Sequence, residues 1–296
     1  MNKKKYESIN KNVIVLYDEM FPLYIVKGEK NFLIDCSITA RAIDIHKTIS
    51  KILKGGKIDS VLLTHSHYDH TGACSYLQNI YNFDIYGSYK TVELLKKEKV
   101  IDFIDKMNQD FKKLLRDNSK TKFDMLNNLK SVKQGDRIKI DNSSYFEILD
   151  TPGHTKCSIS FLLQPEKILF PGDSVGVVER NGNIKPLFLS SYKEYEKSLN
   201  KLIKIEPNIL AFCHNKYIKG KDKIKNFLEL SLKSTKELKD EILKNLKKDR
   251  DFVKIAQEIF KKEFSMPFVM GPHKAIMINI KAMVNSVYKE FVEEKT

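Results

Sequence analysis

The chain has 296 residues, 42% of them hydrophobic and 30% charged, which is typical of a globular protein with one large domain or two smaller ones. Its net charge of +14 does not indicate a nucleic-acid partner, because five of its 52 basic residues are arginine and the lysines are mixed with acidic residues on predicted helices. No apolar run approaches the roughly 20 residues of a membrane span, and the basic start lacks a signal-like apolar region, so we expect no membrane partner and a cytoplasmic location.

The first part of the chain predicts strands followed by two helices. Short runs of β-branched and aromatic residues predict three strands between residues 12 and 36, the last two joined as a hairpin. Residues 39–54 have the spacing of an amphipathic helix that ends at a pair of glycines. His46 lies on the apolar stripe of that helix, so we expect a structural role for it. The buried strand SVLLTH follows, and a helix is expected over residues 71–81.

The rest of the chain predicts a second set of strands between helical segments. Residues 90–130 are rich in lysine, contain neither glycine nor proline and have helical spacing. Strands return with DRIKI, YFEILDT, SISFLL and KILFPGD, followed by a helix over residues 192–205 and the strand ILAFCH. From residue 221 onward the apolar residues recur at helical steps. We therefore expect a domain over residues 1–220 with a helical insertion at about 90–130, and a C-terminal helical extension over 221–296.

Four short phrases, each after a predicted strand, contain five of the seven histidines. They are HSHYDH at 65–70, TPGHT at 151–155, FPGDS at 170–174 and FCHN at 212–215. Together with two aspartates they offer seven nitrogen or oxygen ligands, which suits two neighbouring divalent ions with a position left for water. The candidate metal ligands are His65, His67, Asp69, His70, His154, Asp173 and His214.

The spacing inside HSHYDH allows contact with two ions. In extended backbone His65 and His67 lie on the same side, so both can reach one ion. Asp69 and His70 come at the turn into the next predicted helix, where they can face a second ion. Imidazole and carboxylate ligands suit zinc, iron and manganese alike. We therefore expect two divalent ions, zinc or iron, with manganese also open.

The cysteines and one serine motif do not indicate a different chemistry. The four cysteines have no paired spacing, so we expect reduced buried thiols, although Cys213 beside His214 can also contact the metal site. The segment GDSVG fits the G-x-S-x-G nucleophile elbow around Ser174. That elbow needs a helix directly after the serine, and the following segment GVVERNGNIKP instead predicts strand and turn. The sequence therefore disfavours a serine hydrolase.

The four phrases, in this order over residues 65–214, resemble those of the metallo-β-lactamase-fold hydrolase superfamily. The resemblance implies an α/β fold, namely a four-layer αβ/βα sandwich of two mixed sheets with helices outside. Asp35 is similar to an aspartate that braces the metal loop in this family. The resemblance also divides the ligands between two ions bridged by Asp173, with His65, His67 and His154 on the first ion and Asp69, His70 and His214 on the second.

Two differences and the helical segments narrow the resemblance to one branch. Lactam-hydrolysing members with two zinc ions commonly have Arg or Cys at the position of His70 and Cys at that of Asp173. The helical segments are similar to those of the branch that contains the quinolone-signal response thioesterase, with glyoxalase II nearby. In that branch the terminal helices help to form the substrate pocket. His273, at the start of the last predicted helix, is therefore a candidate pocket residue, with a core histidine as the alternative.

We expect a metal-dependent hydrolase of a small-molecule thioester or ester, with a metal-bridging hydroxide as nucleophile. The expected catalytic residues are Asp69, which orients the hydroxide and accepts its proton, and Asp173, which holds the two ions together. No further general acid is evident, and a thiolate leaving group needs little protonation, which favours thioesters. Two alternatives remain: a phosphodiesterase or nuclease of the same superfamily, or a metal-holding regulatory interaction module. The assembly is left open, with a homodimer as one option.

Overall fold

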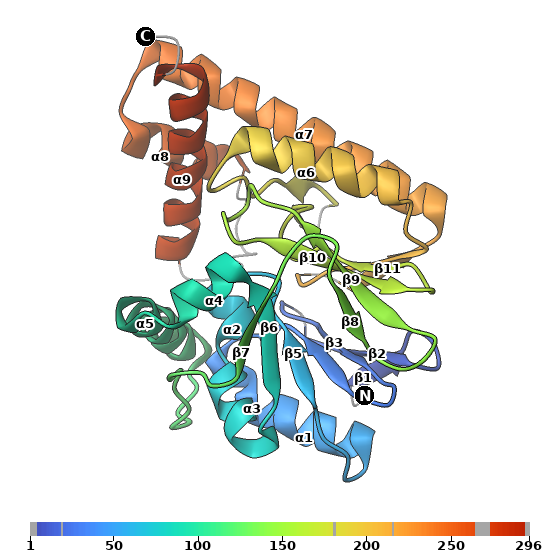
Figure 1. Cartoon of the computed structure of the whole chain (residues 1–296). Coiled ribbons are helices and arrows are strands. Elements are labelled where there is room, and N and C mark those ends of the chain that lie inside the picture. Colours follow the sequence, from blue (N-terminus) through green and yellow to red (C-terminus); the bar gives the residue numbers. More distant parts are fainter. Residues whose placement is uncertain (1–4, 19, 180–181, 215, 264–272, 294–296) are drawn as a thin grey trace.

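Two mixed β-sheets lie face to face at the centre of the chain, and helices cover their outer faces (Figure 1). The structure is a computed structural model that describes residues 5–18, 20–179, 182–214, 216–263 and 273–293. The arrangement confirms the α/β sandwich of two mixed sheets expected from the sequence. The carboxyl ends of several strands meet at one edge of this sandwich, where the four histidine and aspartate phrases also lie.

The first sheet has seven strands in sequence order. Its first four strands are antiparallel neighbours, and its last four are parallel neighbours. The expected hairpin is present as the antiparallel pair of the third and fourth strands. The strands are β1 (Tyr6–Ser8), β2 (Val13–Leu16), β3 (Leu23–Val26), β4 (Phe32–Ile34), β5 (Ser60–Leu62), β6 (Asp84–Ser88) and β7 (Leu129–Val132).

The second sheet has six strands in the order β15-β14-β11-β10-β9-β8. Its neighbours are antiparallel except for β11 and β14, which are parallel. A separate two-stranded ribbon, β12 (Val177–Val178) with β13 (Ile184–Lys185), follows the third phrase. The strands of the sheet are β8 (Arg137–Lys139), β9 (Tyr145–Asp150), β10 (Ile159–Gln164), β11 (Ile168–Phe170), β14 (Ile209–Ala211) and β15 (Tyr217–Lys219).

Alternating side chains of the strands divide the apolar residues among three layers of core. In β10, Phe161 and Leu163 point into the core between the sheets, whereas Leu162 joins the core under the second set of helices. In β2, Val15 points into the core between the sheets, and Ile14 points towards the helices that cover the first sheet. Successive side chains of a strand point to opposite faces of its sheet, and here both faces are covered. Both sets of side chains are therefore apolar, so the strands appear in the sequence as apolar runs.

The helices of the first half lie on the outer face of the first sheet and at its end (Figure 1). The helix expected over residues 71–81 is present over residues 74–81, and Gly72 and Ala73 separate it from a one-turn helix over residues 68–71. A Cβ on Gly72 would lie 2.5 Å from Oδ1 of Asn108 and 2.8 Å from the Thr39 nitrogen, so this residue allows close packing of two segments. The helices are η1 (Thr39–Arg41), α1 (Ala42–Leu53), α2 (Tyr68–Thr71), α3 (Cys74–Tyr81), α4 (Tyr89–Leu95) and α5 (Glu98–Leu115).

The segment expected as a helical insertion contains more than helices. Helices α4 and α5 cover its first part, residues 116–128 form no regular element, and β7 begins at residue 129. Since β7 pairs in parallel with β6, the two helices belong to the crossover between neighbouring strands.

Four helices of the second half cover the second sheet and one end of the molecule (Figure 1). Apolar side chains of α6, α7 and α9 share one core with Leu162 and Leu210 of the sheet. No helix within the described ranges is long and apolar enough to cross a membrane. The helices are α6 (Tyr192–Ile205), α7 (Lys221–Lys248), α8 (Phe252–Glu263) and α9 (His273–Phe291).

Candidate metal centre

The seven candidate ligands come from the segments that follow four strands, five from loops and two from the short helix α2. His65 follows β5, and His67 precedes α2, which carries Asp69 and His70. The other three lie in the loops after the second sheet's strands, His154 after β9, Asp173 after β11 and His214 after β14. Rigid strands therefore hold short loops that converge on one place, which is the arrangement that a precisely positioned site requires.

The first group of ligands contains three histidines and one aspartate. One ligand atom from each of His65, His67, His154 and Asp173 lies within 4.8 Å of the others. The ring centroids of His65 lie 4.6 Å from His67 and 4.8 Å from His154. Nε2 of His154 lies 3.0 Å from Nδ1 of His67 and 3.3 Å from Oδ2 of Asp173. This grouping brings together the three histidines that the resemblance assigned to one ion.

The second group lies on the other side of Asp173. It comprises His70, Asp173, Cys213 and His214, again with one ligand atom each within 4.8 Å. Oδ1 of Asp173 lies 3.2 Å from Nε2 of His214 and 3.5 Å from Nε2 of His70. Asp173 is thus common to both groups, with one carboxylate oxygen directed to each.

Asp69 lies at the margin of the second group. Its Oδ2 is 3.6 Å from Nε2 of His214, and it is not a member of the four-residue set that contains Cys213. The thiol of Cys213 donates to Oδ1 of Asp173 at 2.9 Å. The structure therefore brings Cys213 into the site, as the sequence left open, and it leaves Asp69 the more open position beside His214.

Three acceptors outside the ligand set orient the histidine rings. Oδ2 of Asp35 lies 2.8 Å from Nδ1 of His70, and the same carboxylate accepts from the Thr64 backbone nitrogen at 2.8 Å. The Leu187 carbonyl oxygen lies 2.8 Å from Nδ1 of His154, and that of Met20 lies 3.2 Å from Nδ1 of His214. An acceptor on one ring nitrogen leaves the other nitrogen free for a metal.

The sequence identified Asp35 by resemblance but did not identify the two carbonyl groups. Each belongs to the backbone of a loop that is remote in sequence from the histidine it contacts. No side-chain pattern marks a backbone carbonyl, so these partners become evident in the folded chain alone.

Burial and neighbouring charges shift the pKa values of these histidines in opposite directions. The pKa values of His65 and His67 lie well below their ordinary value, because burial and the neighbouring histidines oppose protonation. Burial also tends to lower the pKa of His70, but Asp35 and Asp173 outweigh it and raise that pKa well above its ordinary value. Burial tends to raise the pKa of Asp173, yet His214, His154 and His70 together hold it well below the usual range.

The donor set fits divalent metal ions. His65 is 0% exposed, and its Nε2, like that of His70, is buried without a hydrogen-bond partner in the described part of the chain. A buried imidazole nitrogen without a partner is costly unless something else binds it. Imidazole and carboxylate ligands in this number suit zinc, iron or manganese. The residues present could therefore hold two ions that share Asp173.

Ser174 has the environment of a structural residue. It is fully buried, its hydroxyl donates to the Thr151 carbonyl at 3.0 Å, and a ribbon strand follows it where a nucleophile elbow needs a helix. The structure confirms that the elbow motif is a coincidence of sequence. Nδ1 of His46, also expected to be structural, lies 2.9 Å from the hydroxyl of Tyr81, the last residue of α3.

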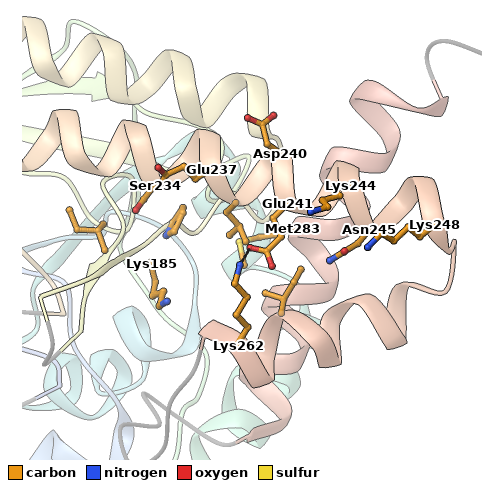
Figure 2. A pocket seen from close by; sticks show the side chains of 14 residues that line it. Lys185, Ser234, Glu237, Asp240, Glu241, Lys244, Asn245, Lys248, Lys262 and Met283 are labelled. Carbon is orange, nitrogen blue, oxygen red and sulfur yellow. Dashed lines mark hydrogen bonds and ion pairs between the residues drawn. The ribbon is translucent and has the colours of Figure 1, made fainter.

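The candidate pocket residue His273 begins α9, but its side chain lies outside the described residues. The helical extension borders a cavity of about 580 Å³ between α7, α8 and β13 (Figure 2). Its carboxylates are matched by lysines, as in the 2.7 Å ion pair of Lys262 with Glu241. None of the seven candidate metal ligands is among its described lining residues, so this cavity does not mark the metal centre.

Comparisons with known proteins agree with this geometry. Residues 22–214 match the family model described as the Metallo-beta-lactamase superfamily. The metallo-beta-lactamase fold-containing protein ST1585 of Sulfurisphaera tokodaii is 27% identical over 218 residues, which are 70% of this chain and 77% of that protein. The crystal structure of an archaeal superfamily protein, ST1585 from Sulfolobus tokodaii, has a TM-score of 0.59 at 20% identity, covering 92% of this chain and 94% of that one.

A hydroxyacylglutathione hydrolase from Polaromonas is also similar. It is 31% identical over 170 residues, which are 53% of this chain and 53% of that protein. The chain thus matches about half the length of this relative.

Proposed function

Since the chain belongs to the metallo-beta-lactamase superfamily, we propose that it is a hydrolase that uses two divalent metal ions to cleave a small-molecule thioester or ester. The observation that carries this proposal is the position of Asp173 between two groups of histidines, all of which except His67 are buried. The similarity to a protein named hydroxyacylglutathione hydrolase supports the thioester class, because that name describes a thioester substrate.

The residues have separate roles in this proposal. His65, His67 and His154 would hold one ion, His70, His214 and Asp69 would hold a second ion, and Asp173 would be shared by both. When bound there, two divalent ions would supply a hydroxide nucleophile near neutral pH and would polarise the carbonyl group of the substrate. Zinc and iron suit the ligand set best, with manganese as a third option.

Asp69 and Asp173 are the proposed catalytic residues. Asp69 lies beside His214 at the margin of the second group, so its carboxylate can orient the attacking hydroxide and accept its proton. Asp173 fixes the separation of the ions, and the Cys213 thiol and the Tyr195 hydroxyl hold it by donating to its Oδ1 at 2.9 Å and to its carbonyl at 3.3 Å. A thiolate leaving group departs with little need for protonation, which favours thioesters over amides.

We further propose that residues 1–220 form the metal-binding domain and residues 221–296 a helical extension that shapes the substrate pocket. Helices α7 and α9 share a core with the second sheet, which supports a fixed position for the extension. His273 at the start of α9 is retained as a pocket residue in this proposal.

The test compares turnover of an S-acyl thioester with that of the matching oxygen ester and amide. We expect thioester turnover in the metal-loaded protein, its loss on removal of metal with a chelator, and its return on adding zinc or iron. His67→Ala should abolish turnover, whereas His46→Ala, the same change outside the ligand set, should retain it. Full thioester turnover by the metal-free protein would contradict the proposal.

A further inference from the structure

A second cavity lies next to the metal centre, between α1, the loop after β2 and the C-terminal end of α5. Its volume is about 430 Å³, within the range of sites that bind small molecules. We call it the α1 cavity and define it by Leu16, Phe21, Ser37, Arg41, Ile45 and Leu115. None of the seven candidate metal ligands is among its described lining residues, so it is distinct from the metal centre.

Ser37 gives the α1 cavity a polar group without a partner. The residue is 1% exposed, and its hydroxyl has no hydrogen-bond partner in the described part of the chain. Its backbone has a φ of 58°, a left-handed conformation that is uncommon for serine. A buried hydroxyl without a partner is unfavourable, and strained backbone of this kind is concentrated at binding sites. A ligand with a hydroxyl group would satisfy Ser37.

The other walls indicate an apolar and uncharged ligand. Leu16, Ile45 and Leu115 supply aliphatic surface. Arg41 is already paired with Asp18, at 2.9 Å between Nε and Oδ2, and Lys5 is balanced by Asp44. Two positive and two negative groups leave no net charge to attract an ion.

The α1 cavity also borders the two chain segments that carry the supports of His70 and His214, through Phe21 beside Met20 and through Ser37 near Asp35. The Phe21 ring, which lines the cavity, lies 5.4 Å from the His214 ring, and the adjacent Met20 carbonyl accepts from His214 at 3.2 Å. Ser37 is two residues from Asp35, whose carboxylate lies 2.8 Å from His70. A ligand in the cavity would therefore contact both segments that orient His70 and His214.

We propose that the α1 cavity binds a small, uncharged, mainly apolar molecule whose hydroxyl group pairs with Ser37, and that binding restrains the supports of His70 and His214 so that the second metal ion is held more firmly. This site goes beyond the proposed hydrolase function and does not depend on the substrate of that function.

The test uses 1-octanol as the probe and the metal-loaded full chain. Isothermal titration calorimetry measures binding to the wild type, to Ser37→Ala and to Leu115→Trp, which would fill the cavity. Leu114→Trp, at the neighbouring exposed position of α5, is the matched control. We expect one binding site in the wild type and in Leu114→Trp, about fivefold weaker binding in Ser37→Ala from the lost hydrogen bond, and none in Leu115→Trp.

Three results would overturn the binding site: no binding to the wild type, equal binding to Leu115→Trp, or unchanged binding to Ser37→Ala. Octanoate tests the ligand class, because tighter binding of this anion than of 1-octanol would contradict an uncharged ligand.

The rate of metal loss to a chelator tests the coupling, that is, whether a ligand in the α1 cavity helps to hold the second metal ion. Saturating 1-octanol should slow the release of the second ion severalfold in the wild type and leave it unchanged in Leu115→Trp, and an unchanged wild-type rate would overturn the coupling. None of these measurements requires turnover, so they remain informative if the thioester proposal fails.

Discussion

The carboxylate of Asp35 lies 2.8 Å from Nδ1 of His70 and also accepts the Thr64 backbone nitrogen at 2.8 Å. One side chain therefore orients a proposed metal ligand and fixes the strand end that leads to His65. Asp35 is 3% exposed and adopts a φ of 55°, so the fold holds it in an uncommon conformation at this position. In the proposed two-ion centre, this relationship would make the second ion dependent on a residue that does not bind it.

Asp35→Asn should weaken binding of the second ion. An asparagine has one acceptor oxygen, so its amide group would face either His70 or Thr64 as a second donor. Loss of such a partner typically reduces metal affinity about 10–100-fold. Metal titration of the purified variant by calorimetry measures this, with Asp102→Asn, on the exposed face of α5, as the control. Equal affinities in Asp35→Asn and the wild type would contradict the role of Asp35.

Gly153→Ala should disturb the loop that carries His154. A Cβ at this position would lie 2.3 Å from the backbone of Tyr195, which cannot move without displacing α6. Gly135→Ala is the matched control, because Gly135 also has a positive φ but has no atom within 4 Å of its added Cβ. We expect about 1 kcal/mol of destabilisation in Gly135→Ala from backbone strain. Gly153→Ala should lose more stability and should bind less metal, as measured by urea unfolding and metal analysis. Similar results for both variants would be inconsistent with the close contact.

Asn108→Ala should destabilise the fold at the turn that carries Asp69 and His70. The Asn108 side chain is 0% exposed, accepts from the Thr39 nitrogen at 2.7 Å and donates to the Tyr68 carbonyl at 3.1 Å. Since each buried group left without a partner costs about 1–3 kcal/mol, we expect a loss of at least about 2 kcal/mol in the free energy of unfolding. Chemical denaturation measures it, with the exposed Asn79→Ala as control. A loss no greater than that of the control would show that α5 does not brace the turn.

Tyr217 should ionise at unusually high pH. Its hydroxyl donates to Glu7 at 2.6 Å, and this hydrogen bond, with burial, raises the pKa of Tyr217 to about 12. A raised pKa means that the stabilisation is complete below pH 10 and is lost as the pH rises towards 12. The absorbance titration of wild type minus Tyr217→Phe isolates this tyrosine. Glu7→Gln should move the titration of Tyr217 towards pH 10. A titration of Tyr217 already near pH 10 in the wild type would refute the contact with Glu7.

The strands and ligand phrases could be predicted because local pattern determines them. Phe161 and Leu162 lie in a mainly apolar run, which indicates a strand with both faces covered, and each phrase follows a predicted strand. The histidines of HSHYDH converge because their spacing and strand ends require it.

The parts that could not be predicted depend on contacts between distant segments. The close packing of Gly72 against Asn108 joins positions 36 residues apart in the chain, and nothing near Gly72 indicates it. The carbonyl groups of Met20 and Leu187 orient His214 and His154 without any side-chain signal. The α1 cavity likewise forms from residues between Leu16 and Leu115 that share no motif.

The number of metal ions bound per chain, measured by elemental analysis of the wild type and of Asp173→Ala, tests the two-ion centre most directly. Asp173 is common to both groups of ligands, so we expect two ions per wild-type chain and one or none in the variant, with the fold retained by circular dichroism. A wild-type chain that binds no more than one ion at saturating metal, or an Asp173→Ala chain that still binds two with unchanged affinity, would contradict it.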